Sequence, residues 1–372
     1  MPHSRNKKTK PERQGVLICG AYGFGNAGDN AILESIVGEL RTIDPELEIT
    51  VLSRDPASAR ESLGVGALHH FDFIRVFFAM RKTKLYISGG GSLIQNVTSR
   101  RSLWYYLFSI YSAKKLGNTV MMYGCGIGPI VDPRDTGLLR SVLNGCVDAI
   151  TLREDYSRGE LERFGVTQPN ITVTCDPVLG LPPIEPGQAD EFMSRVGLDP
   201  EGEYVCFSVR EWEGFSRHAQ AFAEAADFVA SKGFTPVFAL LNGSEDLGAT
   251  VQVLTQMTTR SKLAIIDDGA LAVGVFSKMK AVVSMRLHGL IFAACAGVPL
   301  IGVSYDPKVT AFLDSIGENL CVPLGQLSKE LLCDMLSGAL ENGLSEEHRQ
   351  VISRLRDAER QNLEIAKQLL ED

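Results

Sequence analysis

Short apolar runs alternate with helix-patterned segments along most of the chain. The first run, residues 15–21 (GVLICGA), precedes Ala31, Ile32, Ile36 and Val37, which are spaced as one face of a helix. The other strand-like runs lie at residues 48–52, 84–88, 119–124, 147–151, 171–174, 203–209, 234–240, 262–266, 280–283 and 298–303. Repeated strand–helix units with continuously apolar strands predict parallel sheets that are covered by helices on both faces.

The alternation stops at residues 176–187 (DPVLGLPPIEPG), where four prolines exclude a helix or a central strand. We place a linker here, between a Rossmann-like α/β domain at 15–180 and a second one at 181–345. The charged segment 346–372 is expected to form a C-terminal helix. Two such domains would face each other across a cleft at the carboxyl ends of their strands, where open α/β sheets bind ligands.

The net charge of −8 argues against a general nucleic-acid-binding protein, and we expect no nucleic-acid partner. Residues 1–14 carry five basic residues against one acid, so we expect a disordered basic tail or one attracted weakly to an anionic membrane. The most apolar stretch, residues 102–113, is shorter than the ~20 residues of a transmembrane helix and predicts a buried amphipathic helix. Eight cysteines without CxxC or metal-ligand spacing predict reduced thiols, no metal site and a cytoplasmic location.

The segment after the first predicted strand, residues 20–30 (GAYGFGNAGDN), contains the GxGxxG pattern of dinucleotide-binding loops. Asp29 argues against a dinucleotide, because its carboxylate would lie at the helix start that binds the pyrophosphate. The second strand also ends in Ser53 and Arg54, whereas an NAD site needs an acid there. A loop that presents Asn26 and Asp29 to a polyol fits better, with simple helix capping as the alternative.

A second glycine-rich segment, residues 89–102 (GGGSLIQNVTSRRS), follows the third strand-like run. Consecutive glycines at a strand end let a ligand approach the backbone closely. The candidate ligand-binding residues of this segment are Gly90, Gly91, Ser92, Gln95, Asn96 and Arg101. The alternative is a helix start that Ser or Thr caps without any ligand. Residues 124–129 (GCGIGP) place further glycines beside the same cleft.

Cations follow several predicted strands in the second half of the chain. Arg210 and Lys308 each come at or just after a strand end. Arg286 and His288 stand two residues apart in SMRLHG, at a strand–helix junction where backbone N–H groups and the helix dipole favour an anion. We interpret this junction, which includes Gly289, as an anion-binding or acid-catalyst site.

Together these strings resemble the polysaccharide pyruvyl transferase family, and within it the bacterial cell-wall type. The resemblance extends over most of residues 15–345 and rests on GxxGxGNxGDNAI, GGGSLIQNVTSRRS, GCGIGP, SVRxW, SMRLHG and GVPLIGVSYDPKV in this order. It implies a GT-B-like fold of two Rossmann-like domains. It also implies transfer of pyruvate from phosphoenolpyruvate to two hydroxyls of one sugar, which forms a cyclic ketal. In the cell-wall type the acceptor is an N-acetylmannosamine residue on an undecaprenyl-pyrophosphate-linked disaccharide, a 4,6-ketal is expected, and the product anchors S-layer-homology domains.

The residue chemistry agrees with this implication. Phosphoenolpyruvate carries a carboxylate and a phosphate, so Arg210, Arg286 and Lys308 are expected to bind it. His288, as an imidazolium near pH 7, would protonate the methylene carbon, and Asp29 is the candidate base. No metal or redox cofactor is required. The acceptor sugar would contact the side-chain amides of Asn26, Gln95 and Asn96.

Two other functions stay open at this point. A GT-B-type glycosyltransferase or epimerase would use the same cations to bind the pyrophosphate of a nucleotide sugar. A non-catalytic sugar- or partner-binding module would have no need of His288 beside Arg286. The lipid-linked acceptor and the basic tail favour peripheral association with the inner face of the cell membrane, and we allow for a homo-oligomer.

Overall fold

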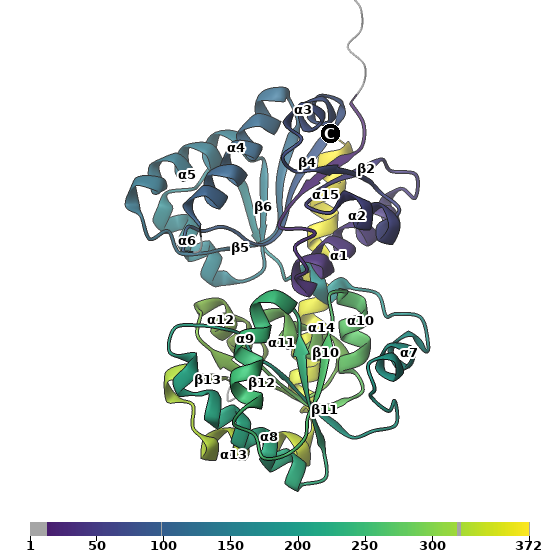
Figure 1. The fold of residues 1–372 in the computed structure, drawn as a ribbon. Coiled ribbons are helices and arrows are strands. Elements are labelled where there is room, and N and C mark those ends of the chain that lie inside the picture. The colour runs from purple at the N-terminus through teal and green to yellow at the C-terminus, as the bar shows by residue number, and fades with distance from the viewer. Residues whose placement is uncertain (1–12, 98, 318–320, 372) are drawn as a thin grey trace, which may run out of the picture.

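The computed structural model describes residues 13–97, 99–317 and 321–371. Two parallel sheets flanked by helices lie one above the other, as Figure 1 shows, which confirms the predicted class of two α/β domains. The basic tail expected at residues 1–14 lies outside the described residues as far as residue 12. No helix in the described ranges is long and apolar enough to cross a membrane.

The first sheet has seven parallel strands in the order β3-β2-β1-β4-β5-β6-β7. Its strands are β1 (Val16–Cys19), β2 (Ile49–Ser53), β3 (Gly66–His69), β4 (Leu85–Ile94), β5 (Thr119–Ile127), β6 (Ala149–Leu152) and β7 (Asn170–Val173). Its helices are α1 (Ala27–Ile43), α2 (Pro56–Leu63), α3 (Phe73–Lys82), α4 (Arg100–Leu116), α5 (Pro133–Cys146) and α6 (Asp155–Phe164). Neighbouring residues of β1 enter different buried clusters, Ile18 with α1 and Leu17 with α4, so both sheet faces are covered.

The second sheet has six parallel strands in the order β10-β9-β8-β11-β12-β13. Its strands are β8 (Tyr204–Ser208), β9 (Thr235–Leu240), β10 (Lys262–Ile265), β11 (Met279–Ser284), β12 (Leu300–Ser304) and β13 (Cys321–Pro323). Its helices are α7 (Gln188–Arg195), α8 (Ala219–Ser231), α9 (Gly243–Leu254), α10 (Gly269–Phe276), α11 (Leu287–Ala296), α12 (Pro307–Ile316) and α13 (Lys329–Asn342), with single turns η1 (Pro177–Gly180), η2 (Phe215–Arg217) and η3 (Leu324–Gln326). Each predicted strand has a counterpart, whereas the short edge strands β3 and β13 were not predicted.

Two predicted strand ends are wrong. β4 and β5 continue through the glycines that the sequence pattern placed at their ends, and Gly91 of β4 pairs with Cys125 of β5. Gly90 and Gly91 have φ values of 59° and 69°, which favour glycine. A Cβ on Gly90 would overlap the side chain of Ile32 in α1. The glycines therefore allow α1 to lie directly on β4.

The C-terminal segment forms two helices where the sequence predicted one. They are α14 (Glu346–Glu359) and α15 (Gln361–Glu371). α15 returns to the first domain and packs against α1 and β5 (Figure 1). Close to the bend, the buried side chain of Asn362 anchors α15: it accepts from Thr174 Oγ1 at 2.7 Å and donates to the backbone oxygen of Cys175 at 3.2 Å. The chain thus crosses between the domains twice, near η1 and near Arg360.

A buried carboxyl pair joins these two crossings. Glu39 of α1 hydrogen-bonds to Glu359 of α14, Tyr123 donates to Glu39, and Asn362 donates to Glu359 Oε1 at 3.1 Å. Burial, and then the charge of Glu39, raises the pKa of Glu359 far above its ordinary range. The two carboxyls therefore share a proton at neutral pH.

Candidate active site

The first turn of α1 lies where the two domains meet. Asn26 caps the helix, because its Oδ1 accepts from the Gly28 N–H at 3.0 Å and its Nδ2 donates to Asp29 Oδ2 at 2.7 Å. Across the interface, the Ala27 N–H donates to the backbone oxygen of Leu241 at 2.8 Å. These bonds fix the helix start against the carboxyl end of β9.

Asp29 lies between β4 and the second domain. A Cβ added to Gly91 would be 3.3 Å from Asp29 Oδ1, so a larger residue there would crowd the carboxylate. Desolvation raises the pKa of Asp29 to about 6, although Lys308, Arg153 and Arg286 act to lower it. A carboxylate with a pKa this close to neutrality can both accept and return a proton.

His288, the second residue of α11, lies directly against Gly28. A Cβ on Gly28 would be 2.8 Å from Cε1 of the imidazole and still closer to its Nδ1 and Cγ. The buried Nε2 is 3.7 Å from Asp176 Oδ2 and has no hydrogen-bond partner within the described part of the chain. Buried polar atoms are normally paired, so this nitrogen is available to a ligand.

The expectation that His288 is an imidazolium at pH 7 is wrong for the protein without substrate. Burial lowers the pKa of His288 to about 4. Asp176 acts to raise that pKa, but the positive charges of Arg153, Lys308 and Arg286 lower it further. The ring is therefore neutral at pH 7 until negative charge enters the site.

Arg286, the N-cap residue of α11, is buried and held by two acids of α9. Its Nε donates to Asp246 Oδ1 at 2.8 Å, and its Nη2 donates to Asp246 and, at 3.2 Å, to Glu245. Asp246 is fully buried and also accepts from the N–H groups of Leu241 and Asn242. The guanidinium is thus rigidly placed, and part of its charge is already compensated.

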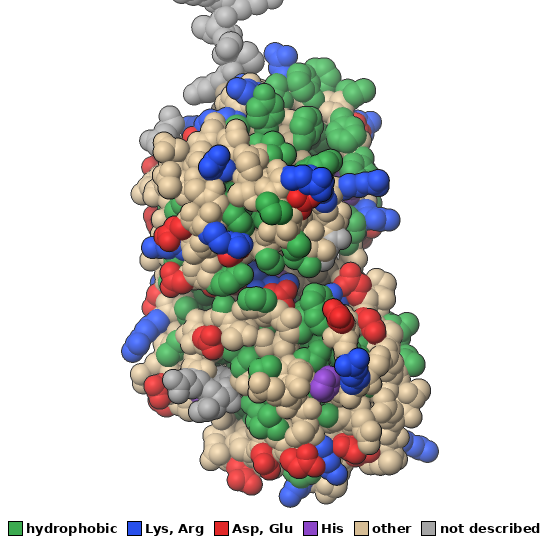
Figure 2. Space-filling view, turned by 90° about the vertical axis from the view of Figure 1, so that its left-hand side faces the viewer, with side chains coloured by type: hydrophobic (Ala, Val, Ile, Leu, Met, Phe, Trp, Pro, Cys, Tyr) green, Lys and Arg blue, Asp and Glu red, His purple; other side chains and the backbone are tan. Residues whose placement is uncertain are grey.

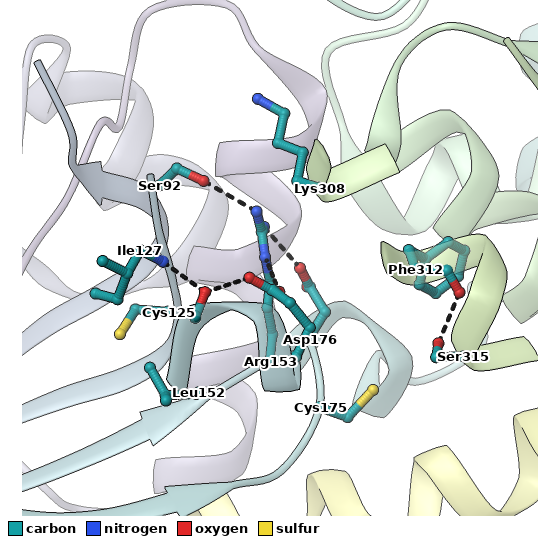
Figure 3. Close-up of polar contacts among 12 residues, drawn as sticks. Ser92, Cys125, Ile127, Leu152, Arg153, Cys175, Asp176, Lys308, Phe312 and Ser315 are labelled. Atoms are coloured by element: carbon teal, nitrogen blue, oxygen red, sulfur yellow. Dashed lines mark hydrogen bonds and ion pairs between the residues drawn. The ribbon is translucent and has the colours of Figure 1, made fainter. Parts of the chain in front are cut away.

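A second buried arginine, Arg153, was not singled out in the sequence. Its Nη1 donates to Asp176 Oδ2 at 3.2 Å, its Nε to Glu154 Oε2 at 2.9 Å and its Nη2 to Ser92 Oγ at 3.0 Å. Figure 3 shows this guanidinium between Ser92 and Asp176, with Lys308 extending from the start of α12 in the neighbouring domain. Ser92, which was predicted to bind substrate, thus orients a cation of the site.

Arg210 lies at the carboxyl end of β8 among aromatic rings. Its guanidinium carbon is 5.5 Å from the ring centroid of Trp212 and 5.3 Å from that of Tyr305, whose hydroxyl accepts from Nη1 at 2.9 Å. In the sequence, Arg210 was predicted as a site residue because it is a cation at the end of an apolar strand. The same signal identifies Arg153, which directly follows the apolar strand β6.

Lys308 marks the open side of the site. Its Nζ is 3.4 Å from Asp306 Oδ2, and its side chain is 29% exposed, more than those of the three arginines. A cavity of about 540 Å³ adjoins the start of α12. It is lined by Tyr156 of the first domain and by Ser304, Tyr305, Asp306, Pro307, Thr310, Ala311 and Asp314 of the second.

Two other predicted site residues have structural partners. Asn96 Nδ2 donates to Asp135 Oδ2 at 3.0 Å, and its Oδ1 accepts from the Val131 N–H at 2.7 Å. The amide therefore holds the loop that follows β5.

A Cβ on Gly289 would lie 3.1 Å from Ser284 Cβ, so this glycine lets α11 begin close to the end of β11.

Gln95 and Arg101 lie at the β4–α4 connection. Gln95 is partly buried against Gly128, where an added Cβ would be 3.3 Å from Gln95 Cγ. Arg101 is exposed in the first turn of α4, whereas its neighbour Arg100 donates to Asp135.

The electrostatically linked residues, which we call the charged cluster, are Asp29, Arg153, Asp176, Arg286, His288 and Lys308.

The charged cluster combines fixed cations with two groups that can exchange protons. Buried guanidinium groups bind carboxylates and phosphates strongly, because the surrounding dielectric is low. A neutral imidazole and a carboxylate with a raised pKa suit proton transfer to and from the bound molecule. No group of His, Cys, Asp and Glu in the described ranges is arranged to hold a metal ion.

Solved structures of similar shape share the fold. The glycosyltransferase of Rickettsia africae has a TM-score of 0.60 at 10% identity and covers 97% of this chain and 100% of its own. HepE of Anabaena, in complex with UDP-glucose, has a TM-score of 0.59 at 12% identity, covering 96% and 98%. The UDP-GlcNAc 2-epimerase of Neisseria meningitidis, bound to UDP-GlcNAc, has a TM-score of 0.63 at 10% identity, covering 96% and 100%. These likenesses confirm the GT-B-like architecture.

Sequence comparison identifies the family. The amylovoran biosynthesis protein AmsJ of Erwinia amylovora is 20% identical and covers 93% of this chain and 96% of its own. The family model of polysaccharide pyruvyl transferases matches residues 26–307, which contain Asp29, Arg153 and His288. The match spans well over half of the chain, so this protein is a transferase that belongs to the polysaccharide pyruvyl transferase family.

Proposed function

We propose that the protein transfers pyruvate from phosphoenolpyruvate to two hydroxyls of an N-acetylmannosamine residue in an undecaprenyl-pyrophosphate-linked cell-wall glycan precursor. The product would be a 4,6-ketal, and phosphate would be released. The charged cluster carries this proposal, because Arg153, Arg286 and Lys308 surround His288 and Asp29 in one site between the domains. Neither a metal nor a redox cofactor takes part.

The donor fits the cations in number and position. Phosphoenolpyruvate joins a carboxylate and a phosphate through one carbon, so it requires two neighbouring anion sites. Arg286, at the N-terminus of α11, supplies one with the help of the backbone N–H groups of that helix. Arg153 supplies the second, and the more exposed Lys308 meets the anion on the open side.

The reaction is an addition to the enol double bond followed by loss of phosphate. Protonation of the methylene carbon turns it into a methyl group and leaves positive character on the adjacent carbon. One sugar hydroxyl attacks that carbon, the carbon–oxygen bond to phosphate breaks, and the second hydroxyl closes the ring. Of the two hydroxyl protons, one replaces the proton spent on the methyl group and the other leaves with phosphate.

His288 is the proposed acid, and the binding of phosphoenolpyruvate would allow its imidazole to become protonated. Three cations help to keep the imidazole neutral in the free protein. The negative charges of phosphoenolpyruvate would compensate these cations and raise the pKa of His288 towards neutrality. Asp29 would take the hydroxyl proton, since its pKa of about 6 leaves it mostly ionised at pH 7.

The first experiment follows phosphate release and product mass with phosphoenolpyruvate and the lipid-linked acceptor. We expect a pyruvyl ketal as the product. The His288→Ala change should lower the rate of its formation by a factor of about 100 or more. His348→Ala is the matched control, because His348 lines a separate cavity with Pro299, at the amino end of β12. Equal turnover of the His288→Ala protein would refute the acid role.

The same experiment separates the alternatives. Thermal stabilisation by phosphoenolpyruvate without ketal formation would point to a different acceptor. Stabilisation by UDP-N-acetylglucosamine and not by phosphoenolpyruvate would instead support a nucleotide-sugar enzyme, such as the UDP-N-acetylglucosamine 2-epimerases of the same fold.

A further inference from the structure

Helix α3 exposes apolar side chains on its outer face. Val76 and Met80 of this helix are buried and attach it to the first domain. The outer face presents Phe73, Ile74, Phe77 and Phe78, which are 59%, 73%, 41% and 58% exposed. Rings at this density are costly in contact with water, and exposed apolar patches of this kind mark interaction sites.

Helix α4 continues this surface. The sequence predicted a buried helix here, but Trp104, Phe108 and Tyr111 are exposed along one side of it. Phe71 joins the two helices, since its ring centroid is 6.2 Å from that of Phe73 and 6.1 Å from that of Tyr105. We call the surface the aromatic face; it consists of Phe71, Phe73, Ile74, Phe77, Phe78, Trp104, Phe108 and Tyr111. Figure 2 shows hydrophobic side chains gathered at the top of the first domain, with Lys and Arg side chains near them.

The two helices are basic in a chain that is acidic overall. Neither α3 nor α4 contains an Asp or Glu, although the whole chain has a net charge of −8. Their basic residues are Arg75, Arg81 and Lys82 in α3 and Arg100, Arg101, Lys114 and Lys115 in α4. Arg75 pairs with Asp72 at the start of α3, and Arg100 and Lys114 pair with acids of other elements. Arg81, Lys82, Arg101 and Lys115 are exposed.

We propose that the aromatic face docks the protein on an anionic phospholipid surface. Helices that lie in a membrane interface combine bulky apolar side chains with Lys and Arg and have few acids, as α3 and α4 do. The rings would enter the headgroup region, and the cations would bind lipid phosphates. A second copy of this chain fits the face poorly, because a symmetric contact would bring the basic residues of both copies together.

Aromatic contacts lead from the aromatic face to the loop before α1. The ring of Phe71 is 4.2 Å from that of His70, and His70 stacks on Phe24 at 5.7 Å. Phe24 is 47% exposed and stands two residues before Asn26, the cap of α1. We expect a glycan anchored in the same membrane to approach the cleft past Phe24. This last step rests on the proposed function, whereas the docking itself does not.

The experiment measures co-sedimentation of the full chain with vesicles of phosphatidylcholine, alone or mixed with phosphatidylglycerol. We expect binding to the mixed vesicles only. The variants Phe77→Ser/Phe78→Ser and Arg81→Gln/Lys82→Gln should each weaken it by about tenfold or more. The control variant Val251→Ser/Leu331→Ser changes exposed apolar residues of the second domain and should bind as the parent does. Unchanged melting temperatures would show that the variants are folded.

The outcomes separate docking from the proposed reaction, because the vesicles contain neither donor nor acceptor. Equal binding of the α3 variants and the parent would overturn the proposal, as would equal binding to neutral and anionic vesicles. If the parent protein is a dimer without vesicles and the Phe77→Ser/Phe78→Ser variant is a monomer, a second copy covers the aromatic face instead, and the proposal is overturned.

Discussion

The close approach of α1 to His288 is tested by Gly28→Ala. The added methyl carbon would be 2.8 Å from Cε1 of the imidazole and closer still to two other ring atoms. Ordinary contacts between such atoms are about 3.5–4.0 Å long, so the ring must retreat by about 1 Å or more. The start of α1 cannot easily move away from the ring, because the Ala27 N–H is hydrogen-bonded to the backbone oxygen of Leu241 across the interface.

Two magnitudes follow from this displacement. Overfilling a packed site costs about 1–3 kcal/mol of stability, and alanine in a helix returns about 0.5–1 kcal/mol relative to glycine. The two contributions leave an expected net loss of up to about 2.5 kcal/mol for Gly28→Ala. A shift of about 1 Å in a catalytic group lowers turnover by about 100-fold, so the Gly28→Ala protein should remain folded but turn over about 100 times more slowly than the parent.

The assay pairs urea unfolding with phosphate release. Gly38→Ala is the matched control in the same helix, because its Cβ would meet no other atom within 4 Å, and it should stabilise the protein slightly. In a His288→Ala background the clash is gone, so Gly28→Ala should no longer destabilise. An equal loss in both backgrounds, or full turnover of the Gly28→Ala protein, would refute the reasoning.

Three further changes test the charges around the site. Arg153→Leu leaves the buried Asp176 uncompensated and should lower the free energy of unfolding by about 3–5 kcal/mol in urea. Glu359→Gln should flatten the pH dependence of unfolding. The raised pKa of Glu359 stabilises the fold fully below about pH 4.5, and this contribution is lost as the pH rises through about 9. Lys308→Met should weaken phosphoenolpyruvate binding about tenfold, measured by thermal shift, with almost unchanged stability.

Opposite results would be informative in each case. An Arg153→Leu protein as stable as the parent would mean that Asp176 is not held by this ion pair. If Glu359→Gln left the slope of stability between pH 5 and pH 9 unchanged, the proton would not be shared with Glu39. Unaltered donor affinity of Lys308→Met would place the anion away from the start of α12.

The alternation of apolar runs was enough to predict the architecture. Strands such as β1 and β8 are buried on both faces, and they are continuously apolar for that reason. The edge strands β3 (GALH) and β13 (CVP) were not predicted, because each contains only two consecutive apolar residues. The edge strands β7 (NITV) and β10 (KLAI) are also half-exposed, but their β-branched or apolar runs are longer. The glycines at 89–91 were predicted to lie at a strand end open to a ligand, whereas they lie within β4 and let α1 approach its backbone.

The site was predicted in its members more than in its chemistry. His288, Arg286 and Lys308 stood out because each lies just beyond an apolar strand. The pairing of Arg286 with Asp246, 40 positions away, depends on which helix ends the fold brings together. The protonation of His288 depends on burial and on cations from three elements, which no local pattern reports.

The double crossing of the chain has a mechanical consequence. The segment near η1 and the segment near Arg360 are hydrogen-bonded to each other through Asn362, so they act as a single pivot. If the two domains move apart, they rotate about this pivot, and the cleft between them widens most at the side farthest from it. Because α15 packs on α1 and β5, it moves with the first domain, whereas α14, which contacts α12, moves with the second. Shortening the chain before Gln361 would free the lobes to twist as well as to open.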